Sequence, residues 1–405
     1  MKKHICMIVY SLYTFDARVR REAETLASEP DYNVTVIALK ETSSPRTYLL
    51  EGVEICELNV PKYRGASMFK YLLSYLWFCI SAFCECTRLS IKTGIDVVHV
   101  HNMPNMLVFC GIIPALMGKR IVLDVHDTVI ETYASKFNSI PNRMIRNVLN
   151  TLLRLEEFLS GAFTDKIIAV NEIQRRRLIG RGIPESKIII SMNVPDPKRF
   201  YGKPPGLKTS QDTHFNVVYF GTITQRLGID LAVRAMKNLV DHIPGIRLHI
   251  IGDGEDKLKF KRLSESLNLD NVVRFSETYY PLEELMPLLR QMDVCVIPNR
   301  RNEATELMLP VKMMESIALD IPVVVPRLEA IQHYFSDDMV FYFEPDDVDS
   351  MAHAILNAYQ DEKNRSTKVR NAQFSLDEYG WENHKHILLN AYKQLTTSLI
   401  HNKRR

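Results

Sequence analysis

The chain has 405 residues, too many for a single hydrophobic core, and this length predicts two domains of ordinary size. Its 46% hydrophobic and 24% charged residues exclude a disordered chain, and a net charge of +3 does not favour nucleic acid as a partner. The seven cysteines lie in apolar stretches, which favours buried reduced thiols in a cytoplasmic protein over a disulfide framework. The first residues run directly into an expected strand, so no signal peptide is expected.

Short apolar, β-branched runs alternate with helical segments along the whole chain. One set extends from Ile5–Tyr10 to Ile188–Ser191, and a second extends from Val217–Phe220 to Val340–Phe343. Runs that are apolar throughout predict parallel strands buried on both faces, and right-handed crossovers then build doubly wound sheets. The expected fold class is therefore α/β, with two doubly wound, Rossmann-like domains facing a central cleft.

The domain boundaries follow from composition. We expect a first domain over 1–195, a linker rich in proline, glycine and polar residues over 196–214, and a second domain over 215–375. A last helix, over 376–405, is expected to pack back on the first domain. Ligands of such sheets bind beyond the carboxyl ends of the strands, so candidate site residues are sought in those loops.

Two segments that precede the middle strands of the first half have informative sequences. SLYTFDARVRREAETLA opens a helix after the first strand, with Asp16 and Arg18 at its entrance as acceptor-side candidates; capping of the helix is the alternative role of Asp16. Met68–Cys86 is apolar, but it is interrupted by Glu85 and shorter than the roughly 20 residues that span a bilayer. A buried or interfacial helix is therefore favoured there.

Histidines mark the ends of two neighbouring strands in the first half. His99 and His101 are two residues apart, so they project from one face of a strand. A metal pair would need a third ligand, and none presents itself at a suitable spacing. His101 and Asn102 lie nearer the strand end and are expected to contact substrate, whereas His99 is interpreted as structural.

The next strand ends at Val125, and His126 follows it at once in LDVHDTVIET. That position makes His126 a candidate site residue of the first domain. Asp127 and Glu131 are candidates for contacts with acceptor hydroxyls, and capping of the next helix is the alternative.

In the second half, VVYFGTITQRLGIDLAVRA reads as strand, turn and helix, with Gly221 and Thr222 at the strand end and Arg226 in the loop. An arginine there can stabilise charge on a departing diphosphate, although a single loop arginine is more often a surface residue. Gly252 and Gly254 form an incomplete glycine fingerprint that permits close approach of the backbone to a ligand.

The stretch ELMLPVKMMESIALDIPVVV predicts a helix that begins at Pro310, since proline suits the first helical position. Its N-terminus, from Leu309 to Val311, offers N–H groups to a diphosphate. Lys312 and Glu315 lie three residues apart on one face, where the carboxylate could bind ribose hydroxyls. A surface Lys–Glu pair is the plain alternative.

These segments together resemble the family-4 retaining glycosyltransferases, which have the GT-B fold. The resemblance is carried by GTITQRLG, LPVKMMESIALDIPVV, DARVRREA and the D-x-H-D pattern from Asp124 to Asp127. It implies that 1–195 is the acceptor-side domain and 215–375 the nucleotide-sugar-binding domain. It also implies that Arg226 and Lys312 bind the donor diphosphate and that Glu315 binds the ribose. His126, which would hydrogen-bond the transferred sugar, is then the strongest catalytic candidate of the first domain.

The resemblance also implies an activity. The chain would transfer a hexosyl or N-acetylhexosaminyl group from a nucleotide-diphosphate sugar, UDP-sugar favoured over GDP-sugar, to a saccharide or lipid-linked saccharide in polysaccharide synthesis. No cofactor is expected, and no metal either, because the single DxD element, at Asp347–Asp349, falls at a helix entry and not at a strand end. A cytoplasmic location with peripheral contact at the inner face of the membrane is expected.

Two departures from the family pattern keep other functions open. A glutamate common in this family is Leu307 here, with Glu303 and Glu306 as nearby substitutes, and a basic residue after the strand-end glycine is Thr222. An inactive sugar-nucleotide-binding subunit is therefore an alternative. A GT-B nucleotide-sugar epimerase is another.

Overall fold

The computed structural model describes residues 2–41, 44–60, 68–137, 142–196, 200, 214–277, 280 and 282–402. The expected linker, 196–214, lies almost wholly outside them. Contacts divide the chain into two compact units, one made of Met1–Asn193 with Glu382–Arg405 and the other of Val194–Trp381. Each unit is built on one sheet, so the α/β class with two Rossmann-like sheets is confirmed.

The first unit contains an eight-stranded sheet in the order β3-β4-β2-β1-β5-β6-β7-β8. All its neighbouring strands pair in parallel except β3 with β4. The strands are β1 Lys3–Ile8, β2 Tyr32–Leu39, β3 Thr47–Leu50, β4 Val53–Leu58, β5 Val97–His101, β6 Arg120–Val125, β7 Lys166–Ala169 and β8 Ile188–Ile190.

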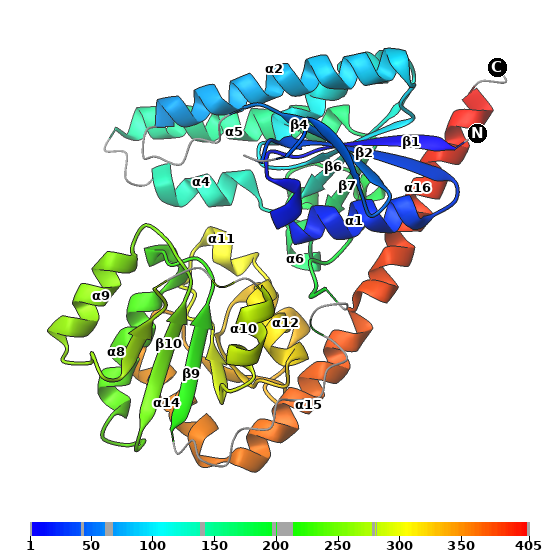
Figure 1. Ribbon diagram of the computed structural model, residues 1–405. Helices are drawn as coiled ribbons and strands as arrows, with labels where there is room; N and C mark the ends of the chain where they lie inside the picture. The colour runs from blue at the N-terminus through cyan, green and yellow to red at the C-terminus, as the bar shows by residue number, and fades with distance from the viewer. Residues whose placement is uncertain are drawn as a thin grey trace. The chain divides into compact units, whose positions relative to one another are not determined.

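Helices cover both faces of this sheet (Figure 1). On one face lie α2, the 3₁₀ segment η2, α3 and α5; α1 and the last helix, α16, lie on the other. The helical bounds are η1 Tyr13–Phe15, α1 Ala17–Ser28, α2 Met68–Lys92, η2 Asn105–Gly111, α3 Ile112–Leu116, α4 Val129–Phe137, α5 Arg143–Phe163, α6 Glu172–Gly180, η3 Glu185–Lys187 and α16 Trp381–Asn402.

The second unit contains a six-stranded, fully parallel sheet in the order β11-β10-β9-β12-β13-β14. The strands are β9 Phe215–Phe220, β10 Ile246–Ile251, β11 Val273–Phe275, β12 Val294–Val296, β13 Val323–Pro326 and β14 Phe341–Phe343. The helices are η4 Gln225–Leu227, α8 Ile229–Leu239, α9 Lys257–Ser266, α10 Leu282–Leu289, α11 Glu303–Glu306, α12 Val311–Ala318, α13 Glu329–Tyr334, α14 Val348–Gln360 and α15 Glu362–Glu378.

The apolar runs predicted as strands all form strands, because both faces of each sheet are covered and alternation is not needed. Two details differ. The last helix starts at Trp381, after α15 has ended in the second unit, and its packing on the first unit is confirmed. Pro310 precedes α12 as its N-cap, with φ −66° and ψ 119°, and the first helical residue is Val311.

Candidate functional site

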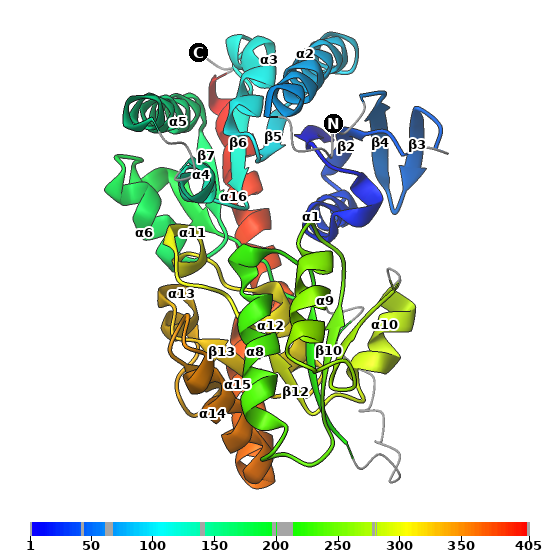
Figure 2. The same ribbon diagram turned by 90° about the vertical axis from the view of Figure 1, so that its left-hand side faces the viewer.

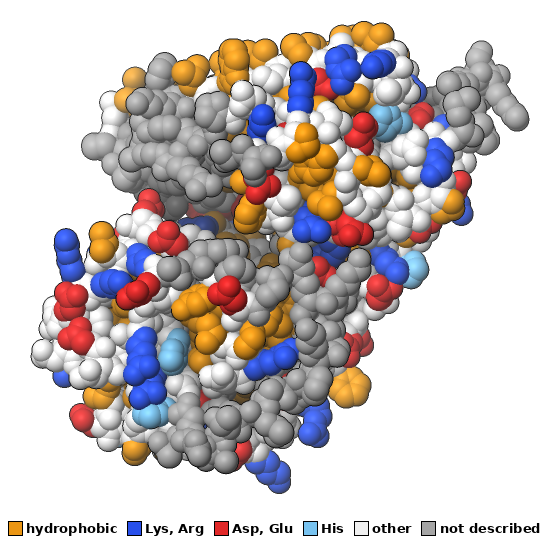
Figure 3. Space-filling model, in the orientation of Figure 1, with side chains coloured by type: hydrophobic (Ala, Val, Ile, Leu, Met, Phe, Trp, Pro, Cys, Tyr) orange, Lys and Arg blue, Asp and Glu red, His pale blue; other side chains and the backbone are white. Residues whose placement is uncertain are grey.

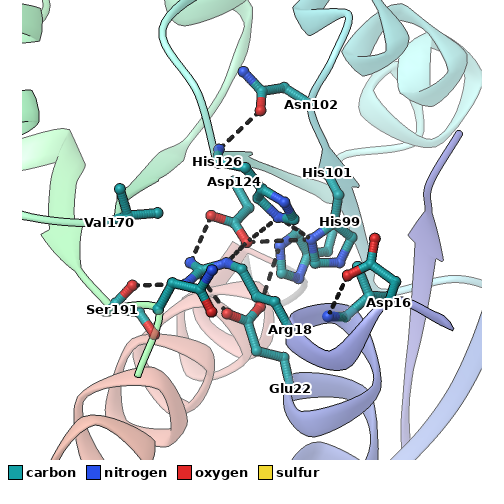
Figure 4. A network of polar contacts seen from close by, with 12 residues as sticks. Asp16, Arg18, Glu22, His99, His101, Asn102, Asp124, His126, Val170 and Ser191 are labelled. Carbon is teal, nitrogen blue, oxygen red and sulfur yellow. Dashed lines mark hydrogen bonds and ion pairs between the residues drawn. The ribbon is translucent and has the colours of Figure 1, made fainter. Parts of the chain in front are cut away.

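A buried carboxylate, Asp124 at the end of β6, organises the polar groups of the first unit (Figure 4). Arg18 of α1 binds it in two places, from Nε to Oδ2 at 2.9 Å and from Nη2 to Oδ1 at 2.8 Å. Nη1 of the same arginine donates to the Ser191 carbonyl at 2.9 Å, and Nη2 lies 3.2 Å from Glu22. The guanidinium therefore has a protein partner for each of its nitrogens.

Two histidines complete the cluster. Asp124 Oδ2 lies 3.2 Å from Nδ1 of His101 and 3.0 Å from Nε2 of His126, and these two nitrogens are 3.1 Å apart. His101 is fully buried, whereas 22% of the His126 side chain is exposed. Of the two, His126 alone reaches the surface of the unit.

Charge pairing governs protonation in this cluster. Burial alone would raise the pKa of Asp124, but Arg18 and His126 hold it well below its ordinary value. Burial alone would lower the pKa of His126, but the Asp124 carboxylate outweighs it, and that pKa is raised. The histidine thus favours the imidazolium form. Its Nε2 is directed at the carboxylate, and no described residue bonds its Nδ1, which is left as an N–H donor for a ligand.

The backbone that carries His126 is fixed by Asn102. Its Oδ1 accepts from the His126 N–H at 2.8 Å, and its Nδ2 donates to the Asp127 carbonyl at 2.7 Å and to Asn105 at 3.0 Å. Both ends of the amide are thus used inside the protein. The expectation that Asn102 contacts substrate is not supported, and its geometry makes it a positioning residue.

Four other acceptor-side expectations also need correction or restatement. Arg18 and His101 are buried and bound to Asp124, so neither is placed to touch a substrate. Glu131 is buried and paired with Arg181, away from any acceptor hydroxyl. Asp16 caps α1, since Val19 N–H donates to it at 3.2 Å; the capping alternative is realised. Asp127 is exposed, so a contact with acceptor remains open to it.

His99 is structural, as interpreted: it is fully buried, and its Nδ1 lies 2.5 Å from the Tyr392 hydroxyl of α16. The expectation that the histidine pair lacks further metal ligands is wrong. Glu22 and Asp124 bring ligand atoms within 4.8 Å of those of His99 and His101, a group that could hold a metal ion. Sequence spacing could not reveal this, because the four residues come from α1, β5 and β6.

In the second unit, the loop after β9 packs against the loop after β10. The Gly221 N–H donates to the Ile251 carbonyl at 2.9 Å. A Cβ on Gly252 would lie 1.9 Å from the Gly221 oxygen, and one on Gly254 would lie 2.1 Å from the Ile223 oxygen. Glycine is therefore required at both positions for backbone-to-backbone packing. The sequence alone did not distinguish this requirement from close approach of the backbone to a ligand.

The cations of the second unit gather beside these loops. The Nη1 of Arg226, in η4, lies 3.8 Å from Sδ of Met308, just before α12, and no described carboxylate lies within ion-pair distance of the guanidinium. Lys312 Cγ lies 3.9 Å from where a Gly221 Cβ would stand. Arg226 and Lys312 are both only partly buried; the charge of Arg226 has no described carboxylate partner, whereas Lys312 is paired with Glu315.

Lys312 and Glu315 contact each other, with Nζ 2.9 Å from Oε2, and Nζ also lies 5.2 Å from the Phe220 ring centroid. The plain Lys–Glu pair is thus formed. Val311 and Lys312 open α12, and the first N–H groups of a helix have no partner within it. Leu309 and Pro310 are half-buried in the approach to that turn.

The position of the missing glutamate is closed to a ligand. Leu307 is 4% exposed at the end of α11. Glu306 accepts from Arg301 Nε at 2.8 Å and from the Glu329 N–H at 2.6 Å, so both its oxygens have partners. Glu303 and Thr222 are exposed, and of the two glutamates Glu303 is the one left available.

Sequence reasoning missed Asp124 and Glu22 as members of the site. Both lie within quoted motifs, D-x-H-D and D-x-R-V-x-x-E-A, whose acidic residues at the buried ends could have been paired with Arg18. A carboxylate at the end of an apolar strand needs a cation nearby, and this was the available signal.

Comparisons with known proteins match each half of the chain to a glycosyltransferase family. Residues 17–199 match the family described as Glycosyltransferase Family 4, and residues 214–361 match that described as Glycosyl transferases group 1. An uncharacterized glycosyltransferase of Methanocaldococcus jannaschii is 24% identical over 359 residues, 83% of this chain and 87% of its own. The amylovoran biosynthesis glycosyltransferase AmsK of Erwinia amylovora is 22% identical over 240 residues, 59% of this chain and 56% of its own.

For the first curated relatives that it matches, the chain spans only between 39% and 56% of their length. Among solved structures, sucrose-phosphate synthase from Thermosynechococcus elongatus superposes with a TM-score of 0.76 at 17% identity, over 98% of this chain and 100% of that one. HepE of Anabaena, in complex with UDP and glucose, gives 0.70 at 14% identity, over 97% and 100%. At such identities these likenesses show a shared fold.

Proposed function

Because the chain belongs to the GT-B glycosyltransferases of the family-4 and group-1 type, we propose that it transfers a sugar from a nucleotide-diphosphate donor to a growing glycan. The transferred group is a hexosyl or N-acetylhexosaminyl residue, and the acceptor is a saccharide or a lipid-linked saccharide. The donor is a UDP-sugar; support comes from HepE, whose structure holds UDP and glucose, and from a trehalose-6-phosphate enzyme of E. coli bound with UDP-2-fluoro glucose.

One observation carries this proposal: Arg226 lies beside the approach to α12 without a described carboxylate partner. When the bond from the sugar C1 to the diphosphate breaks, the electron pair goes to a phosphate oxygen. Arg226, Lys312 and the first N–H groups of α12 stabilise that charge. Glu315, next to Lys312, accepts hydrogen bonds from the ribose.

The transfer proceeds with retention of configuration and without a divalent ion. The acceptor oxygen bonds to C1 on the face that the diphosphate leaves, and its proton passes to the departing phosphate oxygen. His126, whose Nδ1 has no described partner, donates a hydrogen bond to the sugar. These steps need no carboxylate nucleophile, and the carboxylates of Asp124, at the end of β6, and of Glu22 beside it are fully buried and bound to Arg18.

The test is nucleotide release from UDP-, GDP- and ADP-sugars by the purified chain, with and without saccharide acceptors. Release from a UDP-sugar that rises with acceptor is expected, and NMR of the product should give the same anomeric configuration as the donor. Tight UDP-sugar binding with neither release nor transfer would favour the inactive subunit instead. That alternative rests on Leu307, which is buried at the position where this family commonly has a glutamate.

A further inference from the structure

One face of the first unit is unusually apolar. Most of the large hydrophobic side chains that are exposed in the described part of the protein lie on α2, η2, α3 and α5 or directly beside them. On α2 they include Leu72, Leu76 and Trp77, with Trp77 57% exposed. We call this surface the apolar face, and define it by the exposed hydrophobic residues of 72–80, 106–117 and 144–159.

These segments form one continuous surface. The 3₁₀ segment η2 packs against both α2 and α5, and α3 packs against α2. Figure 2 shows α5, α3 and α2 side by side along one face of the sheet. Hydrophobic side chains gather over α2 in the space-filling view (Figure 3). Patches of this kind mark interaction surfaces on soluble proteins.

The pattern along α5 is that of a helix lying at an interface. Exposed apolar residues recur every three or four positions along it, at Met144, Val148, Leu152, Leu155 and Phe158. All five are about half exposed or more, while the buried positions of α5 face the unit. A stripe this long with nothing described against it is typical of an amphipathic helix at a lipid surface.

The exposed charges on the two long helices that carry this face have one sign. The exposed charged residues in the described parts of α2 and α5 are Arg88, Lys92, Arg143 and Arg154. The acidic residues of both helices are turned inward; Glu85, for example, is 4% exposed and paired with Arg88. A face that combines apolar side chains, an exposed tryptophan and only basic charges complements an anionic lipid surface.

The burial pattern of α2 suits a helix that lies along such a surface, not one that crosses it. By length and composition Leu72–Lys92 could span a membrane. Its inner side, however, is part of the core of the first unit, with Phe78, Ala82 and Cys86 fully buried. Crossing a bilayer would expose that core, whereas lying flat buries only the outer side.

We propose that the apolar face binds the surface of a bilayer that contains anionic lipid. The expectation of peripheral membrane contact rested on residues 68–86 alone; the structure adds α3 and the whole length of α5. This inference concerns where the protein docks. It stands whether or not a sugar is transferred.

The test uses the full chain and vesicles of phosphatidylglycerol with phosphatidylcholine. Flotation should recover the protein with these vesicles, less with phosphatidylcholine alone, and less as salt rises from 0.1 to 0.5 M. Trp77 supplies a direct signal, because the only other tryptophan, Trp381, is 5% exposed. Its emission should shift to the blue on binding and be quenched by brominated lipid chains.

A double substitution on α5, Val148→Glu with Leu152→Glu, should weaken vesicle binding at least tenfold. Both positions are about half exposed, so the fold should persist, as checked by thermal melting. The control is Phe374→Glu, at a still more exposed apolar residue on α15, and this variant should bind vesicles as the unaltered chain does.

Unchanged vesicle binding by the α5 variant would overturn the proposal, as would absence of binding by the unaltered chain. Sedimentation velocity tests a second copy of the chain as the occupant. A dimer that forms without lipid and is lost in the α5 variant would also overturn it. None of these readouts uses sugar transfer, so failure here is distinct from failure of the proposed reaction.

Discussion

Charged residues have opposite roles at two places in the molecule: the ends of strands β5 and β6, and the ends of strands β9 and β10. At the first pair, Arg18 is 3% exposed and its guanidinium is bound by Asp124, Glu22 and a carbonyl. At the second pair, Arg226 is partly exposed with no described acidic partner, beside loops held together by their own backbone. Charges of the first unit thus position one histidine, while the charge of Arg226 in the second remains available for an anion.

The sharpest test of this contrast is Arg18→Ala. It leaves the carboxylates of Asp124 and Glu22 buried without their cation, so the free energy of unfolding should fall by about 3–5 kcal/mol. Urea denaturation measures it. The control is Arg20→Ala, which breaks the partly exposed pair with Glu24 on the same helix and should cost at most about 1 kcal/mol. Similar losses in the two variants would contradict the contrast.

A buried carboxylate of the same unit that lacks a cation should behave in the opposite way to Asp124. Burial raises the pKa of Glu156 to about 7, and no described lysine or arginine pairs with it. The folded state then keeps a proton that the unfolded chain loses above its ordinary pKa of 4.5. Stability should therefore fall by roughly 3 kcal/mol at most as pH rises from 4.5 to 7.

Glu156→Gln removes that titration. Denaturation at pH 5 and at pH 7.5 should show a smaller loss of stability in the variant than in the unaltered chain. An equal loss in both proteins would mean that Glu156 is not the group responsible.

In the second unit, substitutions that add a side chain between the closely packed loops should be poorly tolerated. Gly254→Ala places a Cβ about where the Ile223 oxygen stands, so it should cost about 1–3 kcal/mol of stability and weaken UDP binding in calorimetry. Gly180→Ala, at the end of α6 with nothing within 4 Å, is the matched control and should be harmless. Normal UDP binding by the Gly254 variant would show that the paired loops do not shape the donor site.

Arg226→Ala tests the available charge. Loss of the guanidinium should slow turnover at least tenfold, which corresponds to about 1.4 kcal/mol of transition-state stabilisation. Stability should change little, because no described carboxylate pairs with Arg226. Arg234→Ala, exposed on α8, should keep full turnover. A rate equal to that of the control would remove Arg226 from the mechanism.

The smallest expected effect is that of a chelator. Turnover in EDTA should match turnover without it, because the cation among Glu22 and Asp124 is the Arg18 guanidinium. Loss of activity that zinc restores would instead assign a metal to the group formed with His99 and His101.

The sequence was informative where chemistry is local, and less so where partners come from different elements. Runs such as Val97–Val100 and Val323–Val325 specify strands by themselves, since strands covered on both faces need only apolar residues. The edge strand β3, Thr47–Leu50, escaped prediction because it is half exposed and pairs antiparallel. Arg226 and His126 were found through the turn that each occupies.

Roles that depend on a distant partner could not be read in the same way. Nothing near Arg18 in the chain indicates that it binds Asp124, and nothing near Glu131 indicates Arg181. The stripe on α5 was a different case, because the spacing of its apolar residues is visible in RMIRNVLNTLLRLEEFLSGAF. The expectation of membrane contact rested on residues 68–86, which are more continuously apolar than α5.

The hydrogen bond between His99 and Tyr392 joins residues 293 positions apart in the chain. It puts a fully buried side chain of α16 against β5, so the first unit is not complete until Trp381–Asn402 has been made. On the ribosome, the strands β1 to β8 emerge long before the helix that covers their buried histidine. The second unit is therefore the part that can finish folding first, although it is made later.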